Sequence, residues 1–251
     1  MQHLYILTGA SRGMGLAMAQ QLLSPAHRLL CVSRSVNEAL SARAKQAGSV
    51  CEQWAQDLAD APACAARLRE WLGTLDPSTF AGATLINNAG VISRIGALED
   101  SEDPDLSNAL RVGLEAPMLL TSAFLDATRQ WASPRKVLNI SSGLGRRAMA
   151  GSAAYCAAKA GMDHFTRCVA LEQAARPQGA RIVSLAPGVI DTDMQVQLRG
   201  GDPAGFPDRD RFVQLHTQGQ LSPPDEAARR VLTYLARPDF GETPVADVRD
   251  A

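Results

Sequence analysis

Long apolar runs, an excess of one charge and paired cysteines are all missing from this chain of 251 residues. Its apolar stretches fall short of the ~18 residues of a membrane span. A net charge of −1 provides no attraction to nucleic acid or to a membrane surface. The first residues also lack the basic start of a secretory signal. These absences favour a cytoplasmic globular protein without a nucleic-acid or membrane partner.

The cysteines and histidines are not arranged as a disulfide framework or as a metal site. The five cysteines are odd in number and lack paired spacing, so we expect them to be reduced. The four histidines have no metal-ligand spacing, and we expect no metal. These residues are Cys31, Cys51, Cys64, Cys156 and Cys168, and His3, His27, His164 and His216.

Short apolar runs alternate with longer helical patterns along the whole chain. We expect strands over residues 4–8, 29–33, 50–55, 83–87, 136–141, 181–186 and 244–248. We expect helices over residues 14–23, 36–47, 62–72, 106–130, 153–175 and 224–235. Apolar strands separated by helices predict a seven-stranded parallel sheet covered on both faces, in a single doubly wound α/β domain of Rossmann type over residues 1–251. Ligands of such sheets bind beyond the carboxyl ends of the strands.

A glycine-rich turn joins the first predicted strand to the first helix, with the spacing G-x-x-x-G-x-G. Glycines allow a tight turn and a close approach of the backbone to a pyrophosphate at the helix N-terminus. An ordinary strand–helix turn is the alternative, but the position near residue 10 favours a dinucleotide. The predicted binding residues are Gly9, Ser11, Arg12, Gly13, Met14 and Gly15.

The end of the second predicted strand indicates which dinucleotide is bound. An acid about 20 residues beyond the glycines would bind the ribose hydroxyls of NAD and repel a 2′-phosphate. Ser33 and Arg34 stand there instead, with Arg34 19 residues after Gly15. Planar guanidinium groups suit phosphate oxygens, and Arg12 adds a second one. We therefore predict NADPH/NADP+, the alternative being that Arg34 is only solvated.

Tyr155 and Lys159 are four residues apart, so they share one face of the predicted helix over residues 153–175. A free phenol has a pKa of ~10, and an ammonium within ~6 Å lowers it. Ser142 follows a predicted strand, where its hydroxyl can bind a substrate oxygen beside the phenol. We predict that Ser142, Tyr155 and Lys159 form a proton-transfer site. An exposed helical face is the alternative for the tyrosine–lysine pair alone.

Short motifs follow three further predicted strands: residues 57–58 after the third, 87–90 after the fourth and 187–192 after the sixth. With the glycine turn and Tyr155-x-x-x-Lys159, this ordered set resembles the short-chain dehydrogenase/reductase family over essentially the whole chain.

Three longer segments carry a finer likeness. Residues 116–122, 155–156 and 187–195 resemble a bacterial subgroup that is related to sepiapterin reductase and includes benzil reductases, which act on one carbonyl of a 1,2-diketone.

The family resemblance implies a role for each motif. Ser142 and Tyr155 would donate to the substrate carbonyl oxygen, and Tyr155 would give it a proton as hydride reaches the carbon. The cofactor would be bound beyond the glycine turn by Asp57 and Leu58 at the adenine, Asn87, Ala89 and Gly90 along the ribose and diphosphate, Tyr155 and Lys159 at the nicotinamide ribose, and Pro187, Gly188, Val189 and Thr192 near the carboxamide.

One position departs from the family pattern. The family places an asparagine in a run like V-N-L-x-A-P, where it anchors a water that leads protons to the lysine, and this chain has Gly113 there. Asn108 lies about 140° away around the helix and is no substitute. Our hypothesis is that the relay survives through the backbone carbonyl of Gly113 and an additional water in the space left by the missing side chain.

The resemblance and the motifs together predict an NADPH-dependent carbonyl reductase for small ketones or 1,2-diketones. The loop over residues 143–152 is small and apolar enough for a roomy pocket, and we expect its Arg146 and Arg147 to be solvated, the alternative being that they attract an acidic substrate. Residues 193–221 are expected to form a substrate lid. We expect a homodimer through the helices over residues 106–130 and 153–175, with a tetramer as the alternative. A pteridine-type reductase, an alcohol dehydrogenase and a silent NADPH-binding sensor are the other functions considered.

Overall fold

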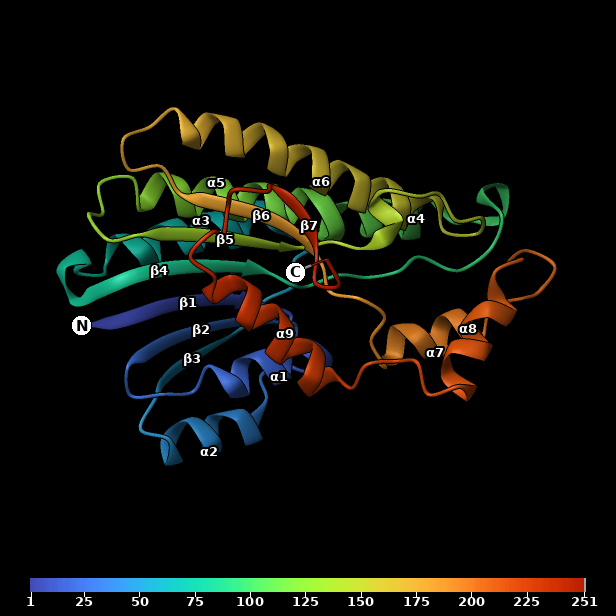
Figure 1. The fold of residues 1–251 in the computed structure, drawn as a ribbon, viewed down its shortest axis with the longest axis horizontal. Helices are drawn as coiled ribbons and strands as arrows, with labels where there is room; N and C mark the ends of the chain where they lie inside the picture. Colours follow the sequence, from blue (N-terminus) through green and yellow to red (C-terminus); the bar gives the residue numbers. More distant parts are fainter. Residues whose placement is uncertain (251) are drawn as a thin grey trace.

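Seven parallel strands in the order β3-β2-β1-β4-β5-β6-β7 form the central sheet of the computed structural model, which describes residues 1–250 (Figure 1). The order reverses between β1 and β4, and this is the point where open α/β sheets bind ligands. The predicted sheet and all seven strands are confirmed, with ends that differ by a few residues. The strands are β1 (Gln2–Thr8), β2 (His27–Ser33), β3 (Val50–Ala55), β4 (Phe80–Asn87), β5 (Arg135–Ile140), β6 (Arg181–Ala186) and β7 (Val245–Asp247).

Helices cover both faces of the sheet, as Figure 1 shows. One face packs against α3 (Ala61–Gly73), α5 (Ala116–Ala127) and α6 (Ala153–Ala174). The other face packs against α1 (Gly13–Gln21), α2 (Glu38–Gln46) and α9 (Pro224–Ala236). Successive strand residues point to opposite faces, so Ile6 joins the first apolar core and its neighbour Leu7 joins the second. Apolar residues on both faces of a strand therefore belong to a sheet buried on both sides.

The helix expected over residues 106–130 is interrupted, which corrects the prediction. It consists of α4 (Asp103–Leu110), a π-helical segment over Arg111–Glu115 and α5. Pro117 has no N–H to donate to the carbonyl of Gly113, and its ring crowds that carbonyl in a regular α-helix. The wider π turn, in which the N–H of Ala116 donates to the carbonyl of Arg111, removes the conflict. Pro117 therefore explains the break.

The segment over residues 193–221 contains two helices that were not predicted, α7 (Asp193–Arg199) and α8 (Arg209–Thr217). They lie beyond the carboxyl ends of the strands, at the right of Figure 1. Phe206 and Phe212 of this segment stack at 5.7 Å between ring centroids and pack on Met149 and Leu198. The segment is thus anchored by its own apolar residues.

Among residues 1–250, no helix combines the length and the hydropathy that crossing a membrane requires.

Candidate active site

The carboxyl ends of β1 and β4 are joined by a network of hydrogen bonds. The Thr8 hydroxyl accepts from the backbone N–H groups of Asn88 and Ala89, each at 3.0 Å. The side-chain amide of Asn88 donates to the carbonyls of Thr8 at 3.0 Å and Gly9 at 3.3 Å. These bonds fix the glycine turn against the loop after β4. Neither Thr8 nor the side chain of Asn88 has a role predicted from the sequence.

The glycine turn fits a dinucleotide. Gly9 and Gly13 have φ angles of 71° and 54°, which residues with a side chain rarely adopt. A Cβ on Gly15 would lie 2.0 Å from the carbonyl oxygen of Gly9, so only glycine fits there. No side chain caps the N-terminus of α1. The turn therefore leaves the first N–H groups of α1 to an external acceptor such as a pyrophosphate.

Arg12 and Arg34 have different surroundings. Arg34 is exposed just after β2, next to Ser33, whose buried hydroxyl has no hydrogen-bond partner among the described residues. Arg12 donates to the carboxylate of Asp193 at 2.8 Å, and both side chains are 68% exposed. Arg34 is thus exposed at the end of β2, whereas Arg12 is paired with the first residue of α7.

The other predicted cofactor residues border the same edge of the sheet. Asp57 is exposed, and its carboxylate accepts from the N–H of Ala59 at 2.9 Å. Asn87 is different, because its buried side chain donates to Asn139 at 2.8 Å and to Thr121 at 3.2 Å. Those bonds tie β4 to β5 and α5, and the side-chain oxygen of Asn87 is buried without a hydrogen-bond partner among the described residues. The remaining members of the set are Leu58, Ala89, Gly90, Pro187, Gly188, Val189 and Thr192, in the loops after β3, β4 and β6.

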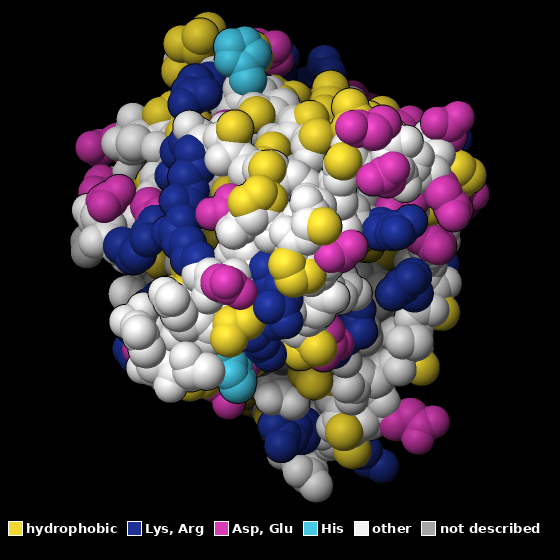
Figure 2. All heavy atoms as spheres, turned by 90° about the vertical axis from the view of Figure 1, so that its right-hand side faces the viewer, with side chains coloured by type: hydrophobic (Ala, Val, Ile, Leu, Met, Phe, Trp, Pro, Cys, Tyr) yellow, Lys and Arg dark blue, Asp and Glu magenta, His cyan; other side chains and the backbone are white. Residues whose placement is uncertain are grey.

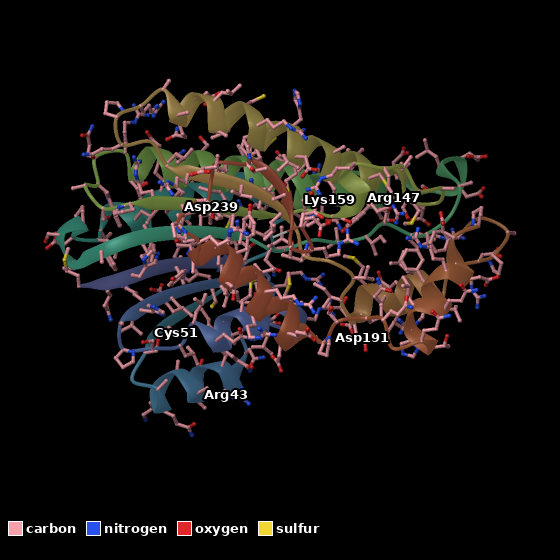
Figure 3. All side chains as sticks on the ribbon, in the orientation of Figure 1. Arg43, Cys51, Arg147, Lys159, Asp191 and Asp239 are labelled. Carbon is pink, nitrogen blue, oxygen red and sulfur yellow. The ribbon has the colours of Figure 1, made fainter. Side chains whose placement is uncertain are left out.

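Ser142, Tyr155 and Lys159 lie together at the strand ends. Tyr155 and Lys159 on α6 are buried, with 8% and 3% exposed, and the Lys159 ammonium lies 5.7 Å from the centre of the Tyr155 ring. Ser142 follows β5, where its hydroxyl accepts from the N–H of Leu144 at 3.2 Å and interacts with the Tyr155 phenol. The Lys159 Nζ donates to the carbonyl of Ile140 at 2.7 Å. Figure 3 shows Lys159 on the α6 side of the strand ends and Asp191 on the opposite side, near α7.

The electrostatics of this group differ from the sequence-based expectation. Burial raises the pKa of Tyr155 to about 12, and the hydrogen bond with Ser142 opposes the rise. Burial also lowers the pKa of Lys159 to about 8, and the charge of Asp163 opposes that fall. The expected net lowering of the Tyr155 pKa is therefore wrong for this structure. Loss of water is the largest cause of both pKa shifts, and it favours the protonated form of the Tyr155 phenol.

Gly113 lies in the π-helical segment, which packs against α6. A Cβ at this position would be 3.0 Å from the Cβ of Ala158, the residue before Lys159. The methyl group of Ala158 thus borders the place of the missing side chain, and the altered relay stays a prediction. Glycine at this position brings the two helices close together.

An apolar cluster lies beside the strand ends. It is built around Met149, Leu198, Phe206 and Phe212, and its partly buried members are Ile92, Ile95, Leu144, Cys156, Met194 and Leu215. Cys156 adjoins Tyr155 in sequence, so this cluster borders the candidate proton donor. Figure 2 shows the side of the molecule at the right of Figure 1, where apolar side chains lie among charged side chains of both signs.

Arg146 and Arg147 differ from each other. Arg147 is exposed, as expected. Arg146 instead donates to the Asp163 carboxylate at 3.3 Å and to the carbonyl of Ala246 at 2.8 Å. The expectation of a solvated side chain is therefore wrong for Arg146, which links α6 to β7.

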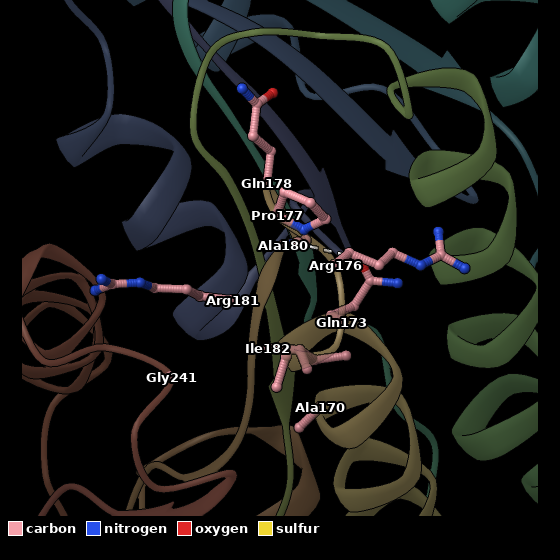
Figure 4. Close-up of a pocket in the computed structure, with 11 residues that line it drawn as sticks. Ala170, Gln173, Arg176, Pro177, Gln178, Ala180, Arg181, Ile182 and Gly241 are labelled. Carbon is pink, nitrogen blue, oxygen red and sulfur yellow. Dashed lines mark hydrogen bonds between the residues drawn. The ribbon is translucent and has the colours of Figure 1, made fainter.

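A cavity of about 230 Å³ opens at the amino end of β6, opposite the end that carries the candidate site (Figure 4). Its wall is ordered by a hydrogen bond from the N–H of Ala180 to the side-chain carbonyl of Gln173, at 3.1 Å. It contains none of the residues discussed above. The lining includes Ala170, Gln173, Arg176, Gln178, Arg181, Ile182 and Gly241.

Comparison with known proteins assigns the family. A family model described as short chain dehydrogenase matches residues 3–202. The chain belongs to the short-chain dehydrogenase family. It is an oxidoreductase of that family, and the expected likeness to benzil and sepiapterin reductases is confirmed.

Two curated relatives cover nearly the whole chain of this family member. A benzil reductase ((S)-benzoin forming) from Bacillus cereus is 36% identical, over 94% of this chain and 94% of its own. A sepiapterin reductase from Meriones unguiculatus is 32% identical, over 94% of this chain and 92% of its own.

A solved structure agrees with the family assignment. A metagenomic short-chain oxidoreductase in complex with NADP has a TM-score of 0.72 and 27% identity, over 98% of this chain and 94% of its own.

Within residues 1–250, no cluster of three or more His, Cys, Asp or Glu side chains is arranged to bind a metal ion.

The close approach of Gly113 to Ala158 makes a testable prediction. We expect Gly113→Asn to lower the free energy of unfolding by about 1–3 kcal/mol, because its Cβ would press on the Ala158 methyl group. Urea denaturation measures the change. Adding Ala158→Gly should recover part of the loss by removing the opposing methyl. A Gly113→Asn variant as stable as the natural protein would show that the helices can separate freely.

Proposed function

We propose that this protein is an NADPH-dependent carbonyl reductase that acts on small apolar ketones and 1,2-diketones. The observation that carries the proposal is the burial of the Tyr155 phenol next to Ser142 and Lys159 at the strand ends, which raises its pKa. A carbonyl group becomes an alcohol by gaining a hydride at carbon and a proton at oxygen. A phenol that keeps its proton at neutral pH suits the second requirement.

The chain's own residues orient the carbonyl and supply the proton. NADPH, when bound, supplies the hydride. The hydroxyls of Ser142 and Tyr155 donate to the carbonyl oxygen, which withdraws electrons from the carbon and aligns it. Tyr155 transfers its proton to that oxygen, and the neighbouring ammonium of Lys159 stabilises the phenolate that forms. The hydrogen bond from Lys159 to Ile140 fixes the ammonium at the strand ends.

The surroundings of Tyr155 favour an apolar substrate. We propose that residues 193–221 act as a lid, with α7 and α8 covering the carbonyl and Phe206, Phe212 and Met149 contacting its substituents. These residues offer hydrocarbon surface and aromatic rings. A 1,2-diketone with aromatic groups matches this surface better than a pteridine ring, whose polar edges require hydrogen-bond partners. The benzil reductase activity of the Bacillus cereus relative supports the same choice.

Tyr155→Phe tests the proposed chemistry. We expect the natural protein to consume NADPH with benzil-like diketones, and the variant to lose at least about 10²-fold of kcat, because the proton donor is missing. The assay follows NADPH absorbance with a panel of diketones, quinones and sepiapterin, followed by chiral analysis of the alcohol.

NADPH binding by fluorescence titration is the control for that variant, since the phenylalanine side chain retains the ring and loses only the hydroxyl. Turnover of sepiapterin alone would favour a pteridine reductase. Tight NADPH binding with background turnover across the panel, in the natural protein, would favour a sensor and contradict the proposal.

The choice of NADPH over NADH depends on Arg34. It is exposed just after β2, where a 2′-phosphate would find its guanidinium. The NADP-bound short-chain oxidoreductase supports this cofactor. Arg12 contributes only if its exposed pair with Asp193 opens, and such pairs are weak.

We expect Arg34→Glu to lower kcat/KM for NADPH by about tenfold or more, and to change kcat/KM for NADH much less. The two cofactors are compared at saturating diketone. Arg43→Ala is the matched control, because Arg43 is an exposed arginine on the neighbouring helix α2 (Figure 3). Equal losses with both cofactors, or a natural preference for NADH, would refute the assignment.

We also propose that the protein forms a homodimer through α4, α5 and α6. Large apolar side chains are exposed on all three helices: Leu110 at 41%, Met118 at 40% and Leu171 at 76%. Apolar patches on a surface are typical of contact regions.

Leu171→Glu should shift this dimer to monomer, because it would bury two carboxylates in the contact. Light scattering coupled to size exclusion measures the mass. Val36→Glu, at a 51% exposed apolar residue just before α2, is the control and should leave the dimer intact. A natural protein that is monomeric, or a Leu171 variant of unchanged mass, would contradict this interface.

A further inference from the structure

A buried carboxylate continues the line of candidate groups along α6. Tyr155, Lys159 and Asp163 follow each other at intervals of four residues, so all three lie on one face of the helix. Asp163 is 2% exposed. The mechanism above does not use it, and a charged group at such depth requires partners.

The partners of Asp163 come from other parts of the fold. Ser184 on β6 donates to one carboxylate oxygen at 2.6 Å, and Arg146 donates to the other at 3.3 Å. A Cβ on Gly145 would lie 2.9 Å from this carboxylate and 2.9 Å from the Lys159 carbonyl oxygen. The turn after Ser142 is thus in direct contact with both residues, and the carboxylate is fixed in place.

We propose that Asp163 is a positioning residue that keeps Lys159 in its charged form and fastens the turn after Ser142 to α6. The carboxylate acts through Lys159 and Arg146 and has no contact with substrate or cofactor in this role. The catalytic consequence rests on the proposed function, but the charge of Lys159 can be tested without it.

The charges around this pair alternate in sign. Lys159 faces Tyr155 and Asp163 on its own helix, the Ile140 carbonyl on β5 and the backbone at Gly90 after β4. Asp163 faces Arg146 from the turn after β5.

The alternation continues on β7. The Asp247 carboxylate binds Arg249 at 2.6 Å. This contact lowers the pKa of Asp247, and the charge of Arg146 adds to the lowering. Neutralising one of these side chains therefore shifts the pKa of its neighbours. The shift is upward where a cation is removed and downward where a carboxylate is removed.

The position of the Lys159 pKa makes this arrangement consequential. Burial lowers that pKa to about 8, and the Asp163 charge is what opposes the fall. Lys159 is therefore mostly charged at pH 7, with little margin. Without the carboxylate, its titration would move toward or below neutral pH, and an uncharged amine would replace the ammonium beside Tyr155.

The chain has only three lysines, Lys45, Lys136 and Lys159, so each can be followed individually by NMR of lysine labelled with ¹³C at Cε. Lys45→Arg and Lys136→Arg assign the signals. In Asp163→Asn we expect the titration midpoint of Lys159 to fall by about one pH unit, with Lys136 unchanged as the internal reference.

Two further variants separate the charge effect from a loosened structure. Asp191→Asn is the matched control, because Asp191 is exposed near α7 and solvent screens its charge (Figure 3). Arg146→Met should move the Lys159 midpoint upward, since it removes a cation. Arg146 has a side chain that is 32% exposed, so this variant keeps the proposal testable if Asp163→Asn fails to fold.

The proposal is overturned if the Lys159 midpoint stays in place in Asp163→Asn, or if both variants move it in the same direction. These titrations need neither cofactor nor substrate, so they remain decisive if no carbonyl compound is reduced. Where reduction is observed, the alkaline limb of the kcat/KM profile should move down in Asp163→Asn and up in Arg146→Met, with the same sign as the NMR midpoints.

Discussion

Removal of water from Tyr155 and Lys159 is the constraint on which the rest of the site depends. Both side chains are inside the protein, where a phenolate and an ammonium lose solvation. The phenol therefore keeps its proton, while the ammonium is retained with a carbonyl partner and a nearby carboxylate. An exposed Tyr-x-x-x-Lys pair would have neither property. The pKa values of this pair therefore depend on its burial at the strand ends. The four-residue spacing along the helix does not determine that burial.

The sheet supplies that depth at the point where its strand order reverses. β1 and β4 lie side by side there, and Thr8 and Asn88 connect their ends through four hydrogen bonds. The glycine turn, the phenol and the loop after β6 consequently share one edge. Asn87 and Asn139 add a second connection between β4 and β5 below the surface. Polar residues after the strands thus serve two purposes, since some face the ligand edge and others hold the strands that form it.

Patterns along the chain predicted the sheet and the meeting of Ser142, Tyr155 and Lys159, because apolar periodicity and motif order are local properties. The π segment was not predicted, although Pro117 indicates a break in the helix, because the apolar run continues through the break. α7 and α8 were missed because the glycines and prolines between them suggested a loop. The pairing of Arg12 with Asp193, and of Arg146 with Asp163, joins residues far apart in sequence. No composition or spacing predicts such contacts; they follow from how the loops pack.

The buried phenol also bears on the direction of the proposed reaction. With its pKa raised to about 12, Tyr155 keeps its proton at pH 7. Donating a proton to a developing alkoxide uses the abundant form, whereas removing one from an alcohol requires the rare form. A cation near the phenol stabilises the ionised form of Tyr155 relative to the protonated form, and Lys159 is the cation at this place. The carboxylate behind Lys159 then matters to both directions, because it helps to keep that nitrogen an ammonium while the phenol loses or regains its proton.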